Sequence, residues 1–123
     1  MAPIAKLLSV ALDCPDPRAL AEFYSAITGW PVGRDNEGWV ELDAGGGPTI
    51  AFQLALDHAA PQWPSVEQPQ QAHLDFDVAD LDLAEAQVVA LGARKTELQP
   101  GEHFRVFLDP AGHPFCLCLE TPT

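Results

Sequence analysis

Three residues in the second half of the chain have side chains that could do chemistry. Cys116 and Cys118 are separated by a single residue, and His73 lies in an earlier alternating segment. A thiol becomes a nucleophile when a base lies beside it, but a buried cysteine also packs well as a small hydrophobic residue. A single histidine in a sheet can likewise be only a hydrogen-bonded structural residue. The residue types therefore leave catalysis and plain packing both open.

Apolar residues that alternate with polar ones predict the strands that would carry these side chains. Leu74, Phe76 and Val78 alternate with polar residues over 71–78, which is typical of a strand with one buried face. The same reasoning predicts further strands at 6–13, 30–35, 38–43, 49–55, 94–98, 103–108 and 114–120.

Two helices are predicted from their capping residues and apolar spacing. Asp16 and Pro17 suit the start of the first helix, and Gly29 suits its end. Asp80 and Gly92 play the same parts for the second helix. The segment between the two halves, 57–70, contains three prolines and should be a connector.

The two halves of the chain repeat the same order of elements. Ser9 corresponds to His73 at an offset of 64 residues, and Gln53 corresponds to Cys116 at an offset of 63. We therefore predict an α+β fold in a single domain, 1–123, made of two βαβββ modules. Their boundaries are about 5–56 for module 1, 57–70 for the connector and 71–121 for module 2.

The repeat and its motifs resemble the vicinal oxygen chelate superfamily, and within it the glyoxalase-like or bleomycin-resistance-like domains. The motifs that carry this resemblance lie at 13–24, 29–30, 73–81, 91–93 and 109–114. The resemblance implies that the modules form a curved mixed sheet around a cavity that binds a small molecule. It also implies a homodimer.

Enzymes of that family hold a divalent metal with four ligands. One ligand comes from the first strand and one from the last strand of each of the two modules. The corresponding positions here are Ser9, Gln53, His73 and Cys116. Ser9 is a poor ligand, and Cys116 replaces the usual Glu, so the set contains no carboxylate. We therefore expect no metal cofactor; in the alternative, a divalent metal would be held by His73, Gln53 and Cys116. A further alternative makes Cys116 a nucleophile with His73 as its base.

Strand alternation also indicates which side chains would line such a cavity. These residues lie on the strand faces opposite the apolar sets, which should pack under the helices. They are Ser9, Trp39, Glu41, Gln53, His73, Asp75, Arg105, Phe107, Cys116, Cys118 and Glu120.

The charge of the chain limits the partners that we expect. Eighteen acidic and six basic residues give a formal net charge of −12. This sign disfavours nucleic acids and anionic membranes as partners, and it favours cationic ligands. No export signal or membrane-spanning stretch is evident, and the three cysteines are an odd number, so we expect a reducing, cytoplasmic location.

These observations favour a protein that binds a small molecule in the cavity between its modules, without the family's usual catalytic metal. One alternative is a metal-dependent lyase, isomerase or dioxygenase of the same superfamily. A second alternative is a non-catalytic dimer that regulates a partner or sequesters a drug.

Overall fold

The structure, a computed structural model, describes residues 3–120. The chain divides into two compact units, with the division between His58 and Ala59. Each unit has a four-stranded mixed sheet and one helix in the order βαβββ, which confirms the predicted α+β fold with two modules. The predicted end of module 2, residue 121, lies outside the described residues.

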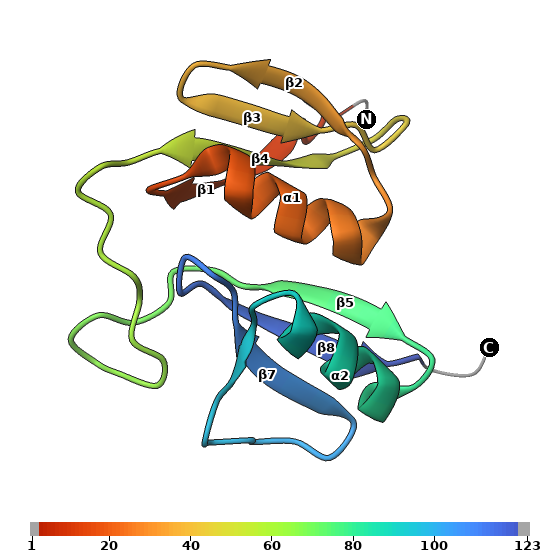
Figure 1. The fold of residues 1–123 in the computed structure, drawn as a ribbon. Helices are drawn as coiled ribbons and strands as arrows, with labels where there is room; N and C mark the ends of the chain where they lie inside the picture. Colours follow the sequence, from red (N-terminus) through yellow and green to blue (C-terminus); the bar gives the residue numbers. More distant parts are fainter. Residues whose placement is uncertain (1–2, 121–123) are drawn as a thin grey trace. The chain divides into compact units, whose positions relative to one another are not determined.

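The first unit places its helix against one face of its sheet, as Figure 1 shows. Strands β1 and β4 pair in parallel, whereas β4–β3 and β3–β2 pair antiparallel, giving the order β1-β4-β3-β2. The elements are β1 (Ser9–Cys14), α1 (Pro17–Thr28), β2 (Val32–Asn36), β3 (Trp39–Leu42) and β4 (Thr49–Leu54).

Helix α1 begins and ends where its capping residues predict. The Asp16 side chain accepts a hydrogen bond from the first turn, and Gly29 ends the helix with φ +77°, a left-handed conformation that suits glycine. The apolar stripe of the helix is buried: Tyr24 is fully covered and stacks on Phe52 of β4, with 5.7 Å between ring centroids. This packing fixes which face of the first sheet is covered.

The second unit repeats this arrangement with the order β5-β8-β7-β6. Strands β5 and β8 pair in parallel, and the remaining pairs are antiparallel. The elements are β5 (Leu74–Val78), α2 (Leu81–Ala90), β6 (Arg94–Lys95), β7 (Phe104–Leu108) and β8 (Pro114–Leu119).

Strand β6 is shorter than the segment 94–98 predicted for it, because a side chain replaces the strand. The amide of Gln99 donates to the carbonyl of Val106 at 2.9 Å and accepts from its N–H at 2.9 Å. These bonds satisfy the edge of β7 without further strand pairing.

Among the described residues, no helix is both long and apolar enough to cross a bilayer.

A buried aspartate closes the turn between β7 and β8. The Asp109 carboxylate accepts hydrogen bonds from the backbone N–H groups of Ala111, at 2.8 Å, and His113, at 3.0 Å. Asp109 is only 1% exposed. The turn therefore depends on a carboxylate that water cannot replace.

We expect Asp109→Ala to lower the free energy of unfolding by about 1–3 kcal/mol, because two part-buried N–H groups lose their buried acceptor. Asp43→Ala is the matched control, since its carboxylate accepts from Gly45 at 2.9 Å in an exposed turn. The control should cost less than about 1 kcal/mol. Urea unfolding of both variants checks this, and equal losses would contradict it.

Candidate functional site

The register of β5 and β8 brings acidic and thiol side chains together. Asp75 lies opposite Cys116, and Asp77 lies opposite Cys118. Alternate residues of a strand point to opposite faces, so these four side chains share one face of the second sheet. Leu117 lies on the other face, which α2 covers. The acids and thiols therefore occupy the face that α2 leaves uncovered.

His73, just before β5, completes a compact cluster with Asp75 and Cys116. Its Nε2 lies 3.2 Å from Oδ1 of Asp75, and one ligand atom from each of the three residues lies within 4.8 Å of the others. The side chains of His73 and Asp75 are 39% and 60% exposed, whereas Cys116 is buried. Small solutes can therefore reach the cluster from the imidazole and carboxylate side.

The thiols of this face are held in their neutral form. Burial raises the pKa of Cys116 to about 12, and the adjacent Asp75, as a negative charge and a hydrogen-bond partner, adds to the shift. Burial, then Asp75 and Asp77, raise the pKa of Cys118 as well. At neutral pH Cys116 is thus a thiol, and the His73 imidazole contacts Asp75. The arrangement does not resemble an activated cysteine nucleophile.

Arg105 and Phe107 were expected beside these residues, but that prediction of their orientation is wrong. Arg105 pairs in register with Leu117, and Phe107 pairs with Phe115, so both lie on the face that α2 covers. Phe107 is fully buried and stacks on Phe115, with 5.7 Å between ring centroids. The strand itself was predicted, but the prediction placed Arg105 and Phe107 on the wrong face of it.

The guanidinium of Arg105 is held by acids of α2. It lies 2.9 Å from Oδ1 of Asp82 and 3.2 Å from Oε1 of Glu85. Lys95 also binds Glu85, at 3.0 Å. Two basic side chains of the second unit are therefore neutralised on the side of the sheet that carries α2.

The predicted residues of the first unit lie on the uncovered face of their own sheet. Trp39 pairs in register with Gln53, and its Nε1 donates to Oε2 of Glu41 at 3.0 Å. Ser9 pairs with Thr49, four residues before Gln53, which is roughly 13 Å along the strand. The structure therefore separates Ser9 from Gln53.

Strand pairing also corrects the predicted correspondence between Gln53 and Cys116. Ala11 pairs with Ala51 as Asp75 pairs with Cys116, so the counterpart of Cys116 is Ala51, at an offset of 116 − 51 = 65. The counterpart of Gln53 is Cys118, at the same offset. Ala51 offers no donor atom to a metal.

The residues present do not fit a metal site with one ligand from each of four strands. Ser9 is a weak donor and Ala51 has none, so the first unit supplies no adequate pair of ligands. The second unit supplies His73 and Cys116, and it adds Asp75, which the family pattern does not include. We therefore assign no chemistry to a four-strand metal.

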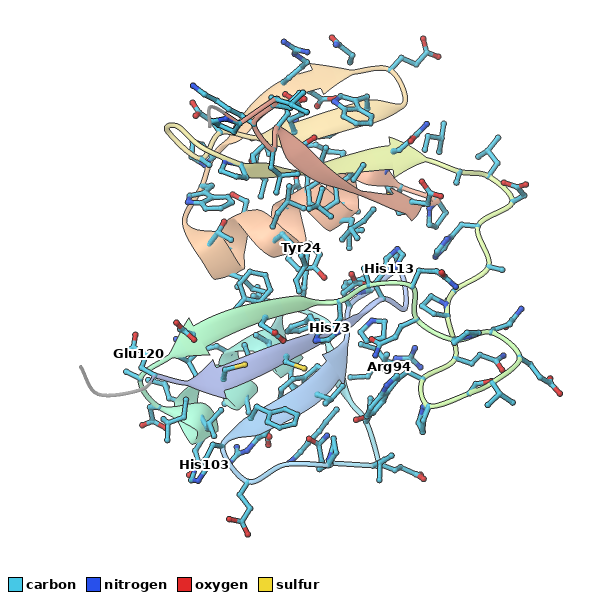
Figure 2. The ribbon with its side chains drawn as sticks, turned by 180° about the vertical axis from the view of Figure 1, so that it is seen from behind. Tyr24, His73, Arg94, His103, His113 and Glu120 are labelled. Atoms are coloured by element: carbon cyan, nitrogen blue, oxygen red, sulfur yellow. The ribbon has the colours of Figure 1, made fainter. Side chains whose placement is uncertain are left out.

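Glu120 follows β8 and is exposed. Its backbone N–H donates to the carbonyl of Val78 at 2.9 Å. Figure 2 shows His73 and Glu120 toward opposite ends of the β5 and β8 pair. Glu120 therefore adds negative charge beside the uncovered face but lies away from the cluster.

A cavity in the second unit was not predicted as a site. It has a volume of about 610 Å³ and lies between the connector, including Trp63, and Arg94 and Leu108. Figure 2 shows Arg94 toward the connector. The sequence of the connector has no periodicity that would predict a cavity. Only Trp63, an aromatic residue among prolines, could have pointed to a site there.

Comparisons with known proteins agree with the fold. A family model described as a glyoxalase-like domain matches residues 9–118. A search of curated proteins finds no match. A glyoxalase/bleomycin resistance protein/dioxygenase family enzyme from Burkholderia phytofirmans PsJN has 20% identity and a TM-score of 0.73, covering 94% of this chain and 98% of its own.

Two further solved structures have the same fold. A glyoxalase family protein from Enterococcus faecalis is 22% identical with a TM-score of 0.67, covering 94% of this chain and 98% of its own. The oxidase ChaP-H2 is 19% identical with a TM-score of 0.66, and the match covers 97% of this chain and 96% of the oxidase chain. With the family model spanning most of the sequence, the chain belongs to the glyoxalase-like domain family of the vicinal oxygen chelate superfamily.

Proposed function

We propose that the chain binds a small, positively charged molecule on the uncovered face of its second sheet. This face, which we call the thiol–carboxylate face, consists of Asp75, Asp77, Phe104, Cys116 and Cys118. Phe104 belongs to it because it pairs in register with Cys118. Phe104 and Asp77 thus lie on either side of Cys118, so the face presents an aromatic ring and carboxylates, and both attract an organic cation.

The separation of charge across the second sheet carries this proposal. Arg105 and Lys95 are bound by acids of α2, whereas the thiol–carboxylate face has two exposed carboxylates. The basic strand residue of that face, Arg94, lies on β6, at the opposite edge of the sheet from Asp75 and Asp77 of β5, and lines the connector cavity. The excess of acid over the whole chain, −12, adds long-range attraction for a cation.

The expected cavity shared by both modules stays a prediction, as do the homodimer and the cytoplasmic location. The proposal needs only the second unit. The face is built on rigid paired strands, which favour a preformed site over one that must be ordered on binding.

A metal-dependent enzyme is the second candidate. Two of the similar structures are named as an oxidase and as a dioxygenase family enzyme, at 19% and 20% identity. The donor set of the first unit argues against chemistry of that type, because Ser9 and Ala51 cannot complete the ligand shell. The protonated Cys116 thiol also argues against covalent catalysis by this residue.

Binding can be tested with 2-phenylethylammonium and its neutral N-acetyl analogue, both with a chelator present. Calorimetry should detect the amine and give at least tenfold weaker binding for the neutral analogue, because only the ammonium group can pair with the carboxylates of Asp75 and Asp77. Binding of the amine should also weaken as salt is raised. Equal affinity for the two molecules, or none for either, would overturn the proposal.

The double variant Asp75→Asn/Asp77→Asn should weaken binding of the amine at least tenfold. Asp82→Asn removes one carboxylate from the same unit on the α2 side, so it serves as the control and should retain binding within about twofold. A greater loss in the control than in the double variant would place the site elsewhere.

The neutral state of Cys116 predicts slow alkylation. At pH 8, a thiol with a pKa of about 12 is on the order of a thousandfold less ionised than one at 9.0. Iodoacetamide labelling, read by peptide mass spectrometry with a chelator present, should modify Cys116 far more slowly in the folded chain than in urea. The rate should rise as the pH is raised above 9.

Asp75→Asn should speed this reaction, because removing the negative charge lowers the pKa of the thiol. Asp82→Asn, on the other side of the sheet, should leave the rate unchanged. Labelling of Cys116 as fast in the folded as in the unfolded chain would show that the thiol is neither shielded nor held neutral.

A further inference from the structure

We propose that His73, Asp75 and Cys116 bind one Zn²⁺ ion per chain, with the second unit alone supplying every protein ligand. This inference goes beyond the binding of an organic cation and does not depend on it. It also differs from a metal held by one ligand from each of four strands, which the first unit cannot support.

The three donors are already gathered. A nitrogen, an oxygen and a sulfur atom lie within 4.8 Å of one another, and the imidazole and carboxylate are 3.2 Å apart. Ligands on one tetrahedral zinc ion lie roughly 3.3–3.6 Å apart, given bond lengths of about 2.0–2.3 Å. Small side-chain rotations would therefore bring all three onto one ion, with no change in the strands.

The strand register explains why Asp75 belongs to the set. Position 116 carries a cysteine, which is softer than a carboxylate, and Asp75 lies directly opposite it on the neighbouring strand. The pair therefore presents a thiol and a carboxylate side by side. Carboxylates, thiolates and imidazoles are all zinc ligands in proteins, and a set of three protein ligands leaves the fourth position for water or a solute.

Charge and donor type favour zinc over harder ions. Binding transfers the Cys116 proton to solvent, and the thiolate and the Asp75 carboxylate then balance the two charges of Zn²⁺. Mg²⁺ and Ca²⁺ prefer shells made of oxygen, which this cluster does not offer. The 60% and 39% exposure of Asp75 and His73 leaves a path for the ion.

Cobalt(II) is a spectroscopic substitute for zinc that reports thiolate ligation directly. The full chain, freed of metal with a chelator and without any organic ligand, should bind one Co²⁺. The product should show a sulfur-to-cobalt charge-transfer band in the near ultraviolet and intense visible bands of a tetrahedral ion. One equivalent of Zn²⁺ should remove both.

Single variants assign the ligands. Cys116→Ser should abolish the charge-transfer band, and His73→Ala and Asp75→Asn should each weaken metal binding at least tenfold. Cys118→Ser and Asp77→Asn are the matched controls, because they lie one position further along the same face of the same strands. They should retain the band and bind metal within about threefold of the parent chain.

X-ray absorption of the zinc-loaded parent chain tests the same point without any variant, should Cys116→Ser fail to fold. We expect one sulfur at about 2.3 Å, with nitrogen and oxygen atoms completing the shell. A shell with no sulfur or with two sulfurs would overturn the proposal. So would less than half an equivalent of bound metal, or binding that Asp75→Asn leaves unchanged. Failure here leaves the amine binding untouched, since that is measured with a chelator.

Discussion

The parallel pairing of β5 with β8 is the constraint on which the site depends. Its register sets Asp75 opposite Cys116 and Asp77 opposite Cys118, and a shift of one residue would turn these side chains under α2. The aromatic stack of Phe107 on Phe115 and the covered Leu117 hold that register, because each would lose its burial in the shifted arrangement. The core on one face thus fixes the chemistry of the other.

The second sheet also separates charge. Acids of α2 bind Arg105 and Lys95 on the side of the helix, whereas Asp75 and Asp77 lie beside the thiols on the other side, with Arg94 at the far edge of the sheet. Burial, and then this negative charge, raise the pKa of both thiols, and the same charge favours a cation, whether an organic ammonium group or a metal ion. The chemistry of this face is therefore recognition of positive charge more than attack by a nucleophile.

Local signals made much of the fold predictable. Asp16, Gly29 and Asp80 cap helices as expected, because capping depends on residues that are neighbours in sequence. The correspondence of Gln53 with Cys116 and the facing of Arg105 and Phe107 could not be obtained this way. Both depend on pairing between strands that are distant in sequence, and a one-residue change in phase reverses the face. That pairing places Asp75 beside Cys116. It also keeps Ser9 and Gln53 too far apart to belong to one site.

The most direct test of a functional thiol–carboxylate face is an amide ¹H–¹⁵N NMR titration of the full chain with 2-phenylethylammonium, with a chelator present. The account predicts that the largest shifts fall on β5 and the second half of β8, around Asp75, Asp77, Cys116 and Cys118. Shifts centred on the connector cavity at Trp63 and Arg94, or on the first sheet, would contradict it.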